Sequence, residues 1–211
     1  MILVGQYDSP YTRRVAISLH LLGIPFERDT RSVFGDAEAI RAINPLGRIP
    51  ALVLDDGEVL IESAAILDHL DEEAGPSHAL LPSRGADRRR ALRIIALATG
   101  TLEKAGAIVY ERTLRPADKQ FAPWVERCRV QAESGLAALE AATGDGWYFG
   151  ARATQPDITV GCVLGYLARG LDFLTPSRYP ALVRLAAAAE ALDAFAITRP
   201  AADEVMPAGL R

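Results

Sequence analysis

The feature that most constrains the fold of this chain is a change in hydrophobic periodicity near residue 75. Before it, short apolar runs typical of strands alternate with helical spacing, whereas the pattern after it is helical throughout and rich in alanine. Turn-forming residues fill the segment from Gly75 to Gly85. The sequence therefore predicts an α/β domain over residues 1–76, a linker over 77–85 and an all-helical domain over 86–211.

In the first domain, turn signals separate the elements. Ser9 and Pro10 precede a run with helical spacing that Gly23 stops, and a turn at residues 44–47 follows a second helical pattern. Asp55-Asp56-Gly57 predicts a hairpin, because Asp and Gly tolerate positive φ. We expect strands over 2–4, 26–30, 51–54 and 59–61, and helices from Pro10 to Gly23, over 36–43 and over 63–74.

In the second domain we expect helices over 86–114, 117–142, 155–171 and 180–195, followed by a tail that carries Pro200 and Pro207. Thr154 and Asp157 have the spacing of a capping box for the third of these helices. We interpret both residues as structural rather than catalytic.

Charge and composition exclude several functions. The net charge of −4 argues against a nucleic-acid partner, which calls for a basic face. The three histidines lack metal-ligand spacing, so we expect no metal. Cys128 and Cys162 are the two cysteines, and this small number predicts no disulfide framework and a cytoplasmic location. Apolar runs are too short for a membrane helix, and the N-terminus lacks the basic region of a secretory signal.

Two short motifs predict a ligand site. Arg48-Ile49-Pro50 precedes an apolar strand, and its Ile-Pro bond is a candidate for the cis form, which would turn backbone groups toward a ligand. Glu62 and Ser63 then open a helix, whose N-terminus favours a carboxylate. Together the motifs indicate a site that binds a peptide-like ligand by its backbone and its carboxylate.

These motifs and two others, in this order and spacing, resemble those of bacterial members of the glutathione S-transferase family over essentially the whole chain. The residues that carry the resemblance are 9–15 (SPYTRRV), 44–52 (NPLGRIPAL), 62–63 (ES) and 154–160 (TQPDITV). The resemblance implies a thioredoxin-like N-terminal domain, an all-helical C-terminal domain and a homodimer. It also implies glutathione as co-substrate and a small hydrophobic electrophile as the second ligand.

The resemblance places Ser9 at the catalytic hydroxyl position, where it would donate a hydrogen bond to the glutathione sulfur. Tyr7 is the alternative donor, since some branches of the family use tyrosine. Tyr7, Tyr11 and Tyr110 are candidates for the substrate pocket, together with the helix around Glu111. Branches that act by thiol exchange have cysteine where this chain has Ser9, so we do not expect that chemistry.

The same resemblance assigns the tripeptide contacts. The main chain of Ile49, held by a cis bond to Pro50, would pair with the cysteinyl part of glutathione. Glu62 would bind the γ-glutamyl ammonium, Ser63 the γ-glutamyl carboxylate, and Arg48 the glycyl carboxylate.

The resulting hypothesis is a serine-type glutathione transferase that activates the glutathione thiolate for attack on a small electrophile. Conjugation, isomerisation and peroxidase chemistry all begin from that thiolate, and the sequence does not separate them. The alternative is a non-catalytic glutathione-binding or protein-interaction module on the same fold.

Overall fold

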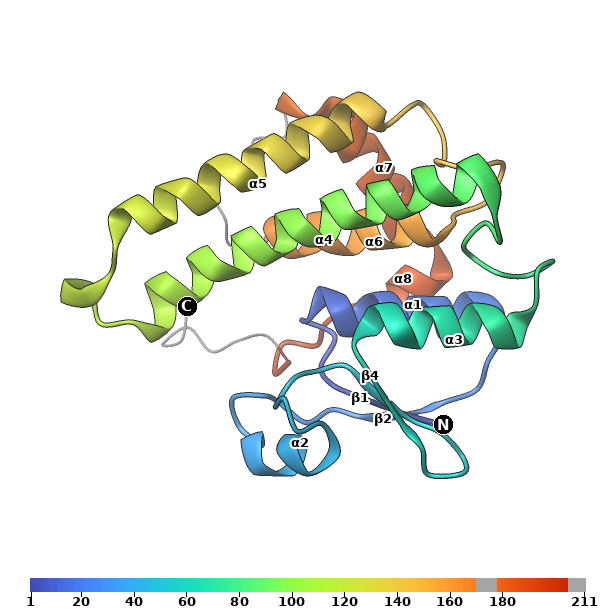
Figure 1. Cartoon of the computed structure of the whole chain (residues 1–211), viewed down its shortest axis with the longest axis horizontal. Coiled ribbons are helices and arrows are strands. Elements are labelled where there is room, and N and C mark those ends of the chain that lie inside the picture. The colour runs from blue at the N-terminus through green and yellow to red at the C-terminus, as the bar shows by residue number, and fades with distance from the viewer. Residues whose placement is uncertain (170–177, 205–211) are drawn as a thin grey trace. The chain divides into compact units, whose positions relative to one another are not determined.

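The computed structural model describes residues 1–169 and 178–204, which form two units (Figure 1). The first unit contains Met1–Ser83 and also residues 190–204 from the other end of the chain. The second unit contains residues 84–169 and 178–189. The predicted fold class is confirmed, since a thioredoxin-like unit with a small mixed sheet is followed by a helical unit.

The first unit is built on a four-stranded sheet. Its strands are β1 (Ile2–Val4), β2 (Glu27–Asp29), β3 (Ala51–Val53) and β4 (Val59–Ile61), in the order β2-β1-β3-β4. β2 runs parallel to β1, while β3 is antiparallel to both β1 and β4. The hairpin predicted between β3 and β4 is present, with Gly57 at a φ of 92°. The strands predicted over 26–30 and 51–54 are shorter than expected.

Helices cover both faces of this sheet. Alternate residues of a strand point to opposite faces, so neighbouring residues of β1 and β3 enter different clusters. Leu3 and Leu52 pack with residues of α1 (Pro10–Leu22) and α3 (Ser63–Ala74). Val4 and Ala51 pack instead with Ile40 of α2 (Ala37–Ile43). The predicted order of strands and helices is therefore confirmed (Figure 1).

The second unit is helical in its described residues. It contains α4 (Gly85–Leu114), the 3₁₀ turn η1 (Ala117–Lys119), α5 (Ala122–Ala142), α6 (Gln155–Leu167) and α7 (Pro180–Glu190), of which the last residue, Glu190, belongs to the first unit. α4 packs against both α5 and α6. The short helix α8 (Asp193–Ala196) belongs to the first unit, where it packs on α1.

Three predicted helix boundaries are wrong. The helix expected over 117–142 is interrupted, and α5 begins at Ala122 with Pro123 in its first turn. A proline farther inside a helix would remove a hydrogen bond and clash with an earlier carbonyl, so the start at Ala122 follows from Pro123. The helix expected over 180–195 is split by Leu192, whose extended backbone separates α7 from α8. The helix expected over 155–171 ends earlier, because α6 stops at Leu167 and residues 168–169 form a turn. The predictions for residues 170–171 and for Pro207 lie outside the described residues.

Carboxylates cap the N-termini of two helices in the second unit. Asp157 accepts hydrogen bonds from the backbone N–H groups of Thr154 and Tyr148, at 2.8 and 2.9 Å, which confirms the predicted capping box. Burial raises the pKa of the Asp157 carboxyl, and these hydrogen bonds oppose the rise. Glu140 of α5 accepts from the N–H groups of Ala181 and Leu182, both at 2.9 Å, and so fixes the start of α7.

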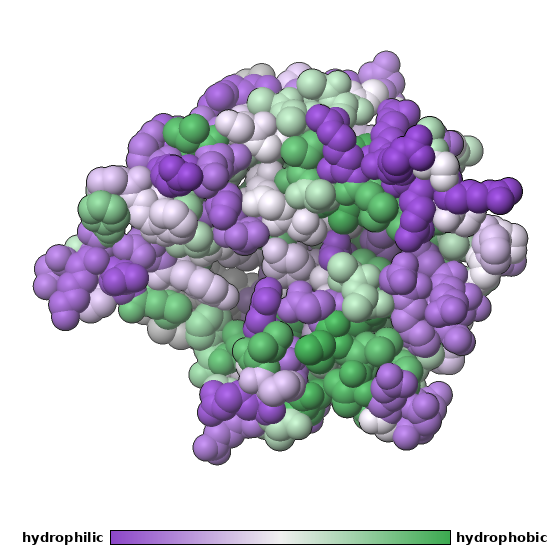
Figure 2. Space-filling model, in the orientation of Figure 1, coloured by the Kyte–Doolittle hydropathy of each residue, from purple (hydrophilic) through white to green (hydrophobic). Residues whose placement is uncertain are grey.

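Hydrophilic residues cover much of the face shown in Figure 2, with smaller hydrophobic patches between them. Among the helices of residues 1–169 and 178–204, none combines the length and the apolar composition needed to span a membrane.

The close packing of α4 against α5 depends on Gly135, and this contact is testable. A Cβ at position 135 would lie 2.0 Å from Oγ1 of Thr101, a hydroxyl fixed by its 2.8 Å hydrogen bond to the Leu97 carbonyl. We expect Gly135→Ala to lower the free energy of unfolding by about 1–3 kcal/mol, the usual effect of overpacking. Urea denaturation followed by circular dichroism measures the change.

Gly106 provides the matched control. It lies in α4, and a Cβ there would have no neighbour within 4 Å. Gly106→Ala should raise stability by about 0.5–1 kcal/mol through helix propensity. Adding Thr101→Ala to Gly135→Ala should recover most of the loss. Equal effects of Gly135→Ala and Gly106→Ala would contradict the packing argument.

Candidate functional site

A buried asparagine shapes the turn before the Ile49–Pro50 bond. The side-chain amide of Asn44 donates to the Arg48 carbonyl at 2.8 Å, and its Oδ1 accepts from the Leu46 N–H at 3.0 Å. The Ile49–Pro50 peptide bond is cis, as predicted. Asn44 therefore holds both ends of the loop that leads into β3, and sequence reasoning treated it only as a turn residue.

Gly5, at the end of β1, allows this loop to approach α1 closely. Its φ is 132°, and a Cβ there would lie 2.8 Å from Thr12 Oγ1 and 2.9 Å from Ile49 Cβ. No other residue type fits between these two side chains. The start of α1 and Ile49 are thus held next to each other, which brings the Ser9 segment close to the predicted main-chain contact.

Glu62 and Ser63 lie at the start of α3, as predicted. Glu62 has φ 66° and ψ 119°, a conformation that L-residues rarely adopt and that costs on the order of 1–3 kcal/mol. Ser63 is the first residue of the helix, so its backbone N–H has no partner within α3. Backbone strain of this kind is often found where a residue is held for function.

A buried arginine that the sequence analysis did not single out lies behind Ser63. Nε and Nη2 of Arg14, on α1, donate to Ser63 Oγ at 3.2 and 2.7 Å. A serine hydroxyl has two acceptor positions and one donor, so these bonds leave its hydrogen as the group available to a ligand. The Ser63 N–H, its O–H and the nearby guanidinium charge together make a site suited to a carboxylate. An arginine within the buried stretch Thr12–Leu19 of α1 needs a polar partner, but the sequence does not identify that partner.

Arg48 and Glu62 form an ion pair at 3.0 Å, with side chains that are 59% and 49% exposed. Exposed ion pairs of this kind contribute about 0–1 kcal/mol to stability. Either side chain can therefore give up the pair and bind an opposite charge on a ligand. Glu62 is thereby available to an ammonium group and Arg48 to a carboxylate.

Ser9 is the N-cap of α1, and Pro10 follows it in the first turn. Its Oγ accepts a long hydrogen bond, 3.4 Å, from the Thr12 N–H. Accepting this bond uses a lone pair and leaves the hydroxyl hydrogen free to donate. Ser9 is half-buried, so its hydroxyl lies at the helix N-terminus without being enclosed.

Tyr7, the alternative hydroxyl, is enclosed in the core of the first unit and is 2% exposed. The Arg28 guanidinium carbon lies 3.4 Å from the centre of the Tyr7 ring. The backbone N–H of Tyr7 donates to the Glu204 carboxylate at 3.4 Å. Glu204 is buried and also pairs with Arg28. Burial raises the pKa of the Tyr7 phenol; Arg28 opposes the rise and Glu204 adds to it. The sequence analysis did not identify Arg28 or Glu204. No local pattern indicates a contact such as that between Tyr7 and Glu204, which are 197 positions apart.

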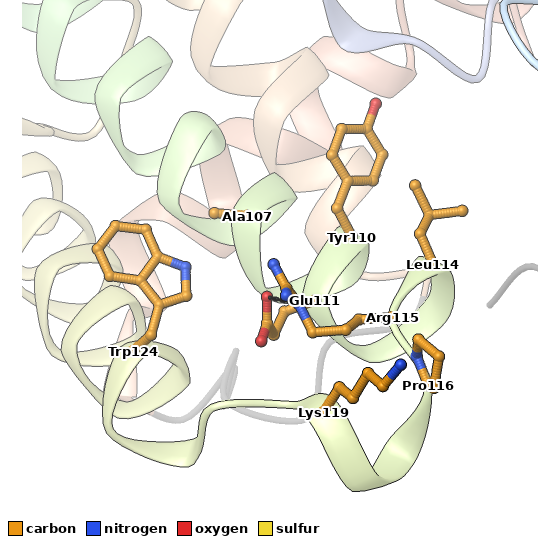
Figure 3. A pocket seen from close by; sticks show the side chains of 8 residues that line it. All are labelled: Ala107, Tyr110, Glu111, Leu114, Arg115, Pro116, Lys119 and Trp124. Atoms are coloured by element: carbon orange, nitrogen blue, oxygen red, sulfur yellow. Dashed lines mark hydrogen bonds and ion pairs between the residues drawn. The ribbon is translucent and has the colours of Figure 1, made fainter.

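The other two candidate tyrosines, Tyr11 and Tyr110, lie in different units. Tyr11 is half-buried on α1, with the Arg14 guanidinium 5.8 Å from its ring centre. Tyr110 is on α4 and lines an open cavity of about 590 Å³ in the second unit (Figure 3). The residues that line this cavity are Ala107, Tyr110, Glu111, Leu114, Arg115, Pro116, Lys119 and Trp124.

Glu111 lies at the centre of this cavity wall and is 8% exposed. Its Oε2 accepts from Arg115 Nε at 3.0 Å, and its Oε1 accepts from the Phe121 N–H at 2.8 Å. Glu111 therefore links the end of α4 to the start of α5. Across the described parts of both units, no group of three or more His, Cys, Asp or Glu residues is placed to bind a metal ion.

Comparison with known families gives two matches. Residues 3–78 match the model of the N-terminal domain of glutathione S-transferases, and residues 122–188 match the model of the C-terminal domain.

Individual relatives extend these matches to the whole chain. The chain is 33% identical to a maleylacetoacetate isomerase of Pseudomonas aeruginosa, covering 99% of this chain and 100% of that protein. A glutathione S-transferase structure from Methylobacterium radiotolerans, in complex with glutathione sulfonate, is 34% identical with a TM-score of 0.88 and covers 98% of this chain and 97% of its own. A Methylobacillus flagellatus glutathione S-transferase with bound glutathione is 32% identical, also with a TM-score of 0.88, covering 95% and 99% of the two chains.

The strained backbone at Glu62 leads to a prediction. Glu62→Gly and Glu62→Ala both remove the carboxylate, but only the alanine variant keeps the Cβ that disfavours φ 66°. We expect Glu62→Gly to be more stable than Glu62→Ala by about 1 kcal/mol in urea denaturation. Both variants should weaken glutathione binding equally in calorimetry. A glycine variant that is no more stable than the alanine variant would show that the backbone is not strained there.

Proposed function

Because the chain belongs to the glutathione S-transferase family, we propose that it activates the thiol of glutathione, its co-substrate, for attack on a small electrophile. The observation that supports this proposal most directly is the hydroxyl of Ser9 at the N-terminus of α1, with its hydrogen free to donate. A donor in this position, at the positive end of the helix dipole, favours a thiolate over a thiol.

The energetics agree with this role for Ser9. A cysteine thiol has a pKa of about 8.5, and lowering that value by two units requires about 2.7 kcal/mol of thiolate stabilisation. A hydrogen bond to a charged group contributes about 1.5–3 kcal/mol, and the helix N-terminus adds to it. Capping alone does not require a serine at position 9, because aspartate caps a helix equally well. A serine hydroxyl can also donate a hydrogen bond to sulfur, which an ionised carboxylate cannot do.

We assign the tripeptide contacts to the motifs at the loop before β3 and at the start of α3. The main chain of Ile49 pairs with the cysteinyl part, and the Ser63 N–H and O–H bind the γ-glutamyl carboxylate. Glu62 binds the ammonium, and Arg48 binds the glycyl carboxylate. The Arg14–Ser63 hydrogen bonds support this assignment, since they direct the Ser63 hydroxyl hydrogen to a ligand.

Tyr7 fits the catalytic role less well than Ser9. Its ring is packed in the core beneath Arg28, and burial raises the pKa of its phenol. A donor to the sulfur has to reach the ligand, and Ser9 is the more accessible of the two hydroxyls.

Conjugation, isomerisation and peroxide reduction share the thiolate as their first species. The full-length similarity to a maleylacetoacetate isomerase makes cis–trans isomerisation with glutathione the first reaction to assay, beside conjugation of a hydrophobic electrophile. We further propose a cytoplasmic homodimer with a role in detoxification. Leu92 on α4 and Val130 on α5 are exposed apolar residues that a second copy would cover.

Ser9→Ala tests the catalytic assignment. Removing one hydrogen bond to the thiolate should lower kcat by about 10- to 100-fold and raise the pKa of bound glutathione, while KM for glutathione changes little. Steady-state kinetics and the ultraviolet absorbance of the bound thiolate across pH measure both effects. Stability should fall by about 0.5–2 kcal/mol, because the helix cap is lost as well.

Ser9→Thr and Tyr7→Phe are the controls for this experiment. Threonine keeps a hydroxyl and a cap, so it should retain more activity than alanine. Tyr7→Phe should leave the thiol pKa unchanged. Full activity of Ser9→Ala together with a loss in Tyr7→Phe would move the role to Tyr7. Glutathione binding without turnover or thiol ionisation in the unmodified protein would favour a binding module.

Light scattering at micromolar concentration tests the dimer. The expected mass is twice the 22.7 kDa of one chain. Leu92→Glu should shift the equilibrium toward monomer, because a charge would be buried against a second copy. Ile197→Glu, at an exposed apolar residue of the first unit, is the matched control. A monomeric unmodified protein would overturn the proposal.

A further inference from the structure

The segment that follows α8 contacts the chain on both sides of Ser9. Before Ser9, the backbone N–H of Tyr7 donates to the Glu204 carboxylate at 3.4 Å. After Ser9, Nε of Arg13 donates to the Thr198 carbonyl at 3.1 Å. We propose that Glu204 is a positioning residue, which holds the turn before Ser9 and so directs the Ser9 hydroxyl toward the thiol of glutathione. The inference rests on the transferase function proposed above and lies wholly within the first unit.

The first step concerns the turn between β1 and α1. Its start is fixed, because the Gly5 N–H donates to the Asp29 carbonyl at 2.8 Å. Its end is held by longer hydrogen bonds, from the Ser9 N–H to the Gln6 carbonyl at 3.3 Å and from the Thr12 N–H to Ser9 Oγ at 3.4 Å. Both exceed the usual range of about 2.7–3.2 Å. Local contacts therefore hold Ser9 loosely, and its orientation depends on what supports the middle of the turn.

Glu204 supplies that support from a fixed position. Its side chain is 5% exposed and is bound by three groups. These are the Tyr7 N–H, the Arg28 guanidinium and the Ala201 N–H, the last at 2.9 Å. A buried carboxylate that shifted would leave these donors without an acceptor, which is costly. The acceptor of the Tyr7 N–H is therefore held in place, and a carboxylate is a stronger acceptor than a neutral group.

Arg28 couples the same carboxylate to the side chain of Tyr7. Its guanidinium carbon lies 3.4 Å from the centre of the Tyr7 ring, and it also pairs with Glu204. Arg28 is on β2, directly opposite Leu3 of β1, so the sheet fixes its backbone. Tyr7 is thus held by its main chain and by its ring. A residue so constrained restricts the positions open to Ser9, two residues farther along the chain.

The segment that carries Glu204 is itself tied to α1. The buried Arg13 donates to the Phe195 carbonyl at 3.0 Å as well as to the Thr198 carbonyl, and α8 packs on α1. Figure 1 shows α8 beside α1. The turn before Ser9 and the helix after it are therefore joined through one segment, and Glu204 is its contact with the turn.

The contacts of Glu204 separate positioning from binding. Its hydrogen bonds go to Tyr7, Arg28 and Ala201, none of which is assigned to a contact with the tripeptide. Loss of Glu204 should therefore leave glutathione bound and impair ionisation of its thiol. A residue that only stabilised the fold would not produce this separation.

Glu204→Ala tests the inference by kinetics. It should lower kcat by about tenfold, measured below the thiol pKa, and raise the pKa of bound glutathione by about one unit, since one unit is a tenfold change in the thiolate equilibrium. KM for glutathione should change by less than about twofold, because uniform binding is kept. Glu204→Gln retains an acceptor for the Tyr7 N–H and should restore most of the activity and of the thiol pKa.

Glu190→Ala is the matched control. Glu190 is the other carboxylate by which residues 190–204 bind the first part of the chain, through Arg13 at 2.8 and 3.0 Å. Its removal should lower stability in urea denaturation but leave kcat and the thiol pKa unchanged, because Glu190 does not contact the turn before Ser9. Equal losses of kcat in Glu190→Ala and Glu204→Ala would overturn the inference and reduce Glu204 to a stabilising contact.

A double-mutant cycle tests whether Glu204 acts through Ser9. In a Ser9→Ala background, Glu204→Ala should lower kcat by less than about twofold, because no hydroxyl is left to position. Independent effects, with the two losses multiplying, would contradict a role through Ser9. A loss in Ser9→Ala with normal kinetics in Glu204→Ala would overturn this inference alone. An unmodified protein that does not ionise bound glutathione would overturn the transferase proposal and this inference together.

Amide hydrogen exchange tests the geometry without glutathione or turnover. Measured by nuclear magnetic resonance, exchange of the Tyr7 N–H should be about tenfold faster in Glu204→Ala, because its acceptor is gone, and unchanged in Glu190→Ala. Glu204→Gln should show slow exchange again. Exchange of the Tyr7 N–H at the unmodified rate in Glu204→Ala would show that Glu204 does not hold the turn, and would overturn the inference whatever reaction the protein catalyses.

Discussion

Two consecutive buried arginines on α1 hold the first unit together. Burying a guanidinium is costly unless its charge and its N–H groups are paired, so each arginine fixes the position of what it binds. Arg13 binds the carboxylate of Glu190 at 2.8 and 3.0 Å and two backbone carbonyls of the segment 190–204. Arg14 binds the hydroxyl of Ser63 at the start of α3. One helix thus secures both the C-terminal segment and the residue that we assign to the γ-glutamyl carboxylate.

The groups of the candidate site belong to the ends of elements rather than to their interiors. Ser9 precedes α1, Ile49 precedes β3 and Ser63 begins α3. Helix N-termini present backbone N–H groups without partners in the helix, which a carboxylate or a thiolate can accept. Glu62, whose backbone conformation is strained, lies in this same region. Its side-chain position is kept there at the expense of the backbone conformation that an L-residue prefers. A peptide ligand that is itself rich in carboxylate and amide groups is complementary to such a site.

The sequence predicted the features that are decided within a few residues. The hairpin at 55–57 and the bounds of α3 depend on turn and capping chemistry that lies within the local sequence. The start of α5 is also decided locally, because Pro123 fits the first turn of a helix and not its interior, so the start predicted at residue 117 disagrees with the local sequence. The hydrogen bonds between Arg14 and Ser63 could not be predicted. Periodicity shows that a helix is buried, not which distant residue it contacts, and the pattern of α1 gave no sign that an arginine within it faces a serine 49 positions away.

The candidate glutathione site and the cavity of the second unit differ in how far their side chains contribute to folding. Arg14 is 3% exposed, and it orients the Ser63 hydroxyl. A substitution of Arg14 would therefore lose this orientation and would also leave buried polar groups without partners, which lowers stability. Lys119 and Leu114 of the second unit are exposed, and exposed side chains contribute little to the stability of the fold. Substitutions of these exposed residues can therefore be made while the protein stays folded. The assignment of Ser63 to the γ-glutamyl carboxylate, in contrast, places ligand recognition on the same buried contacts that stabilise the first unit, so one set of contacts would serve both.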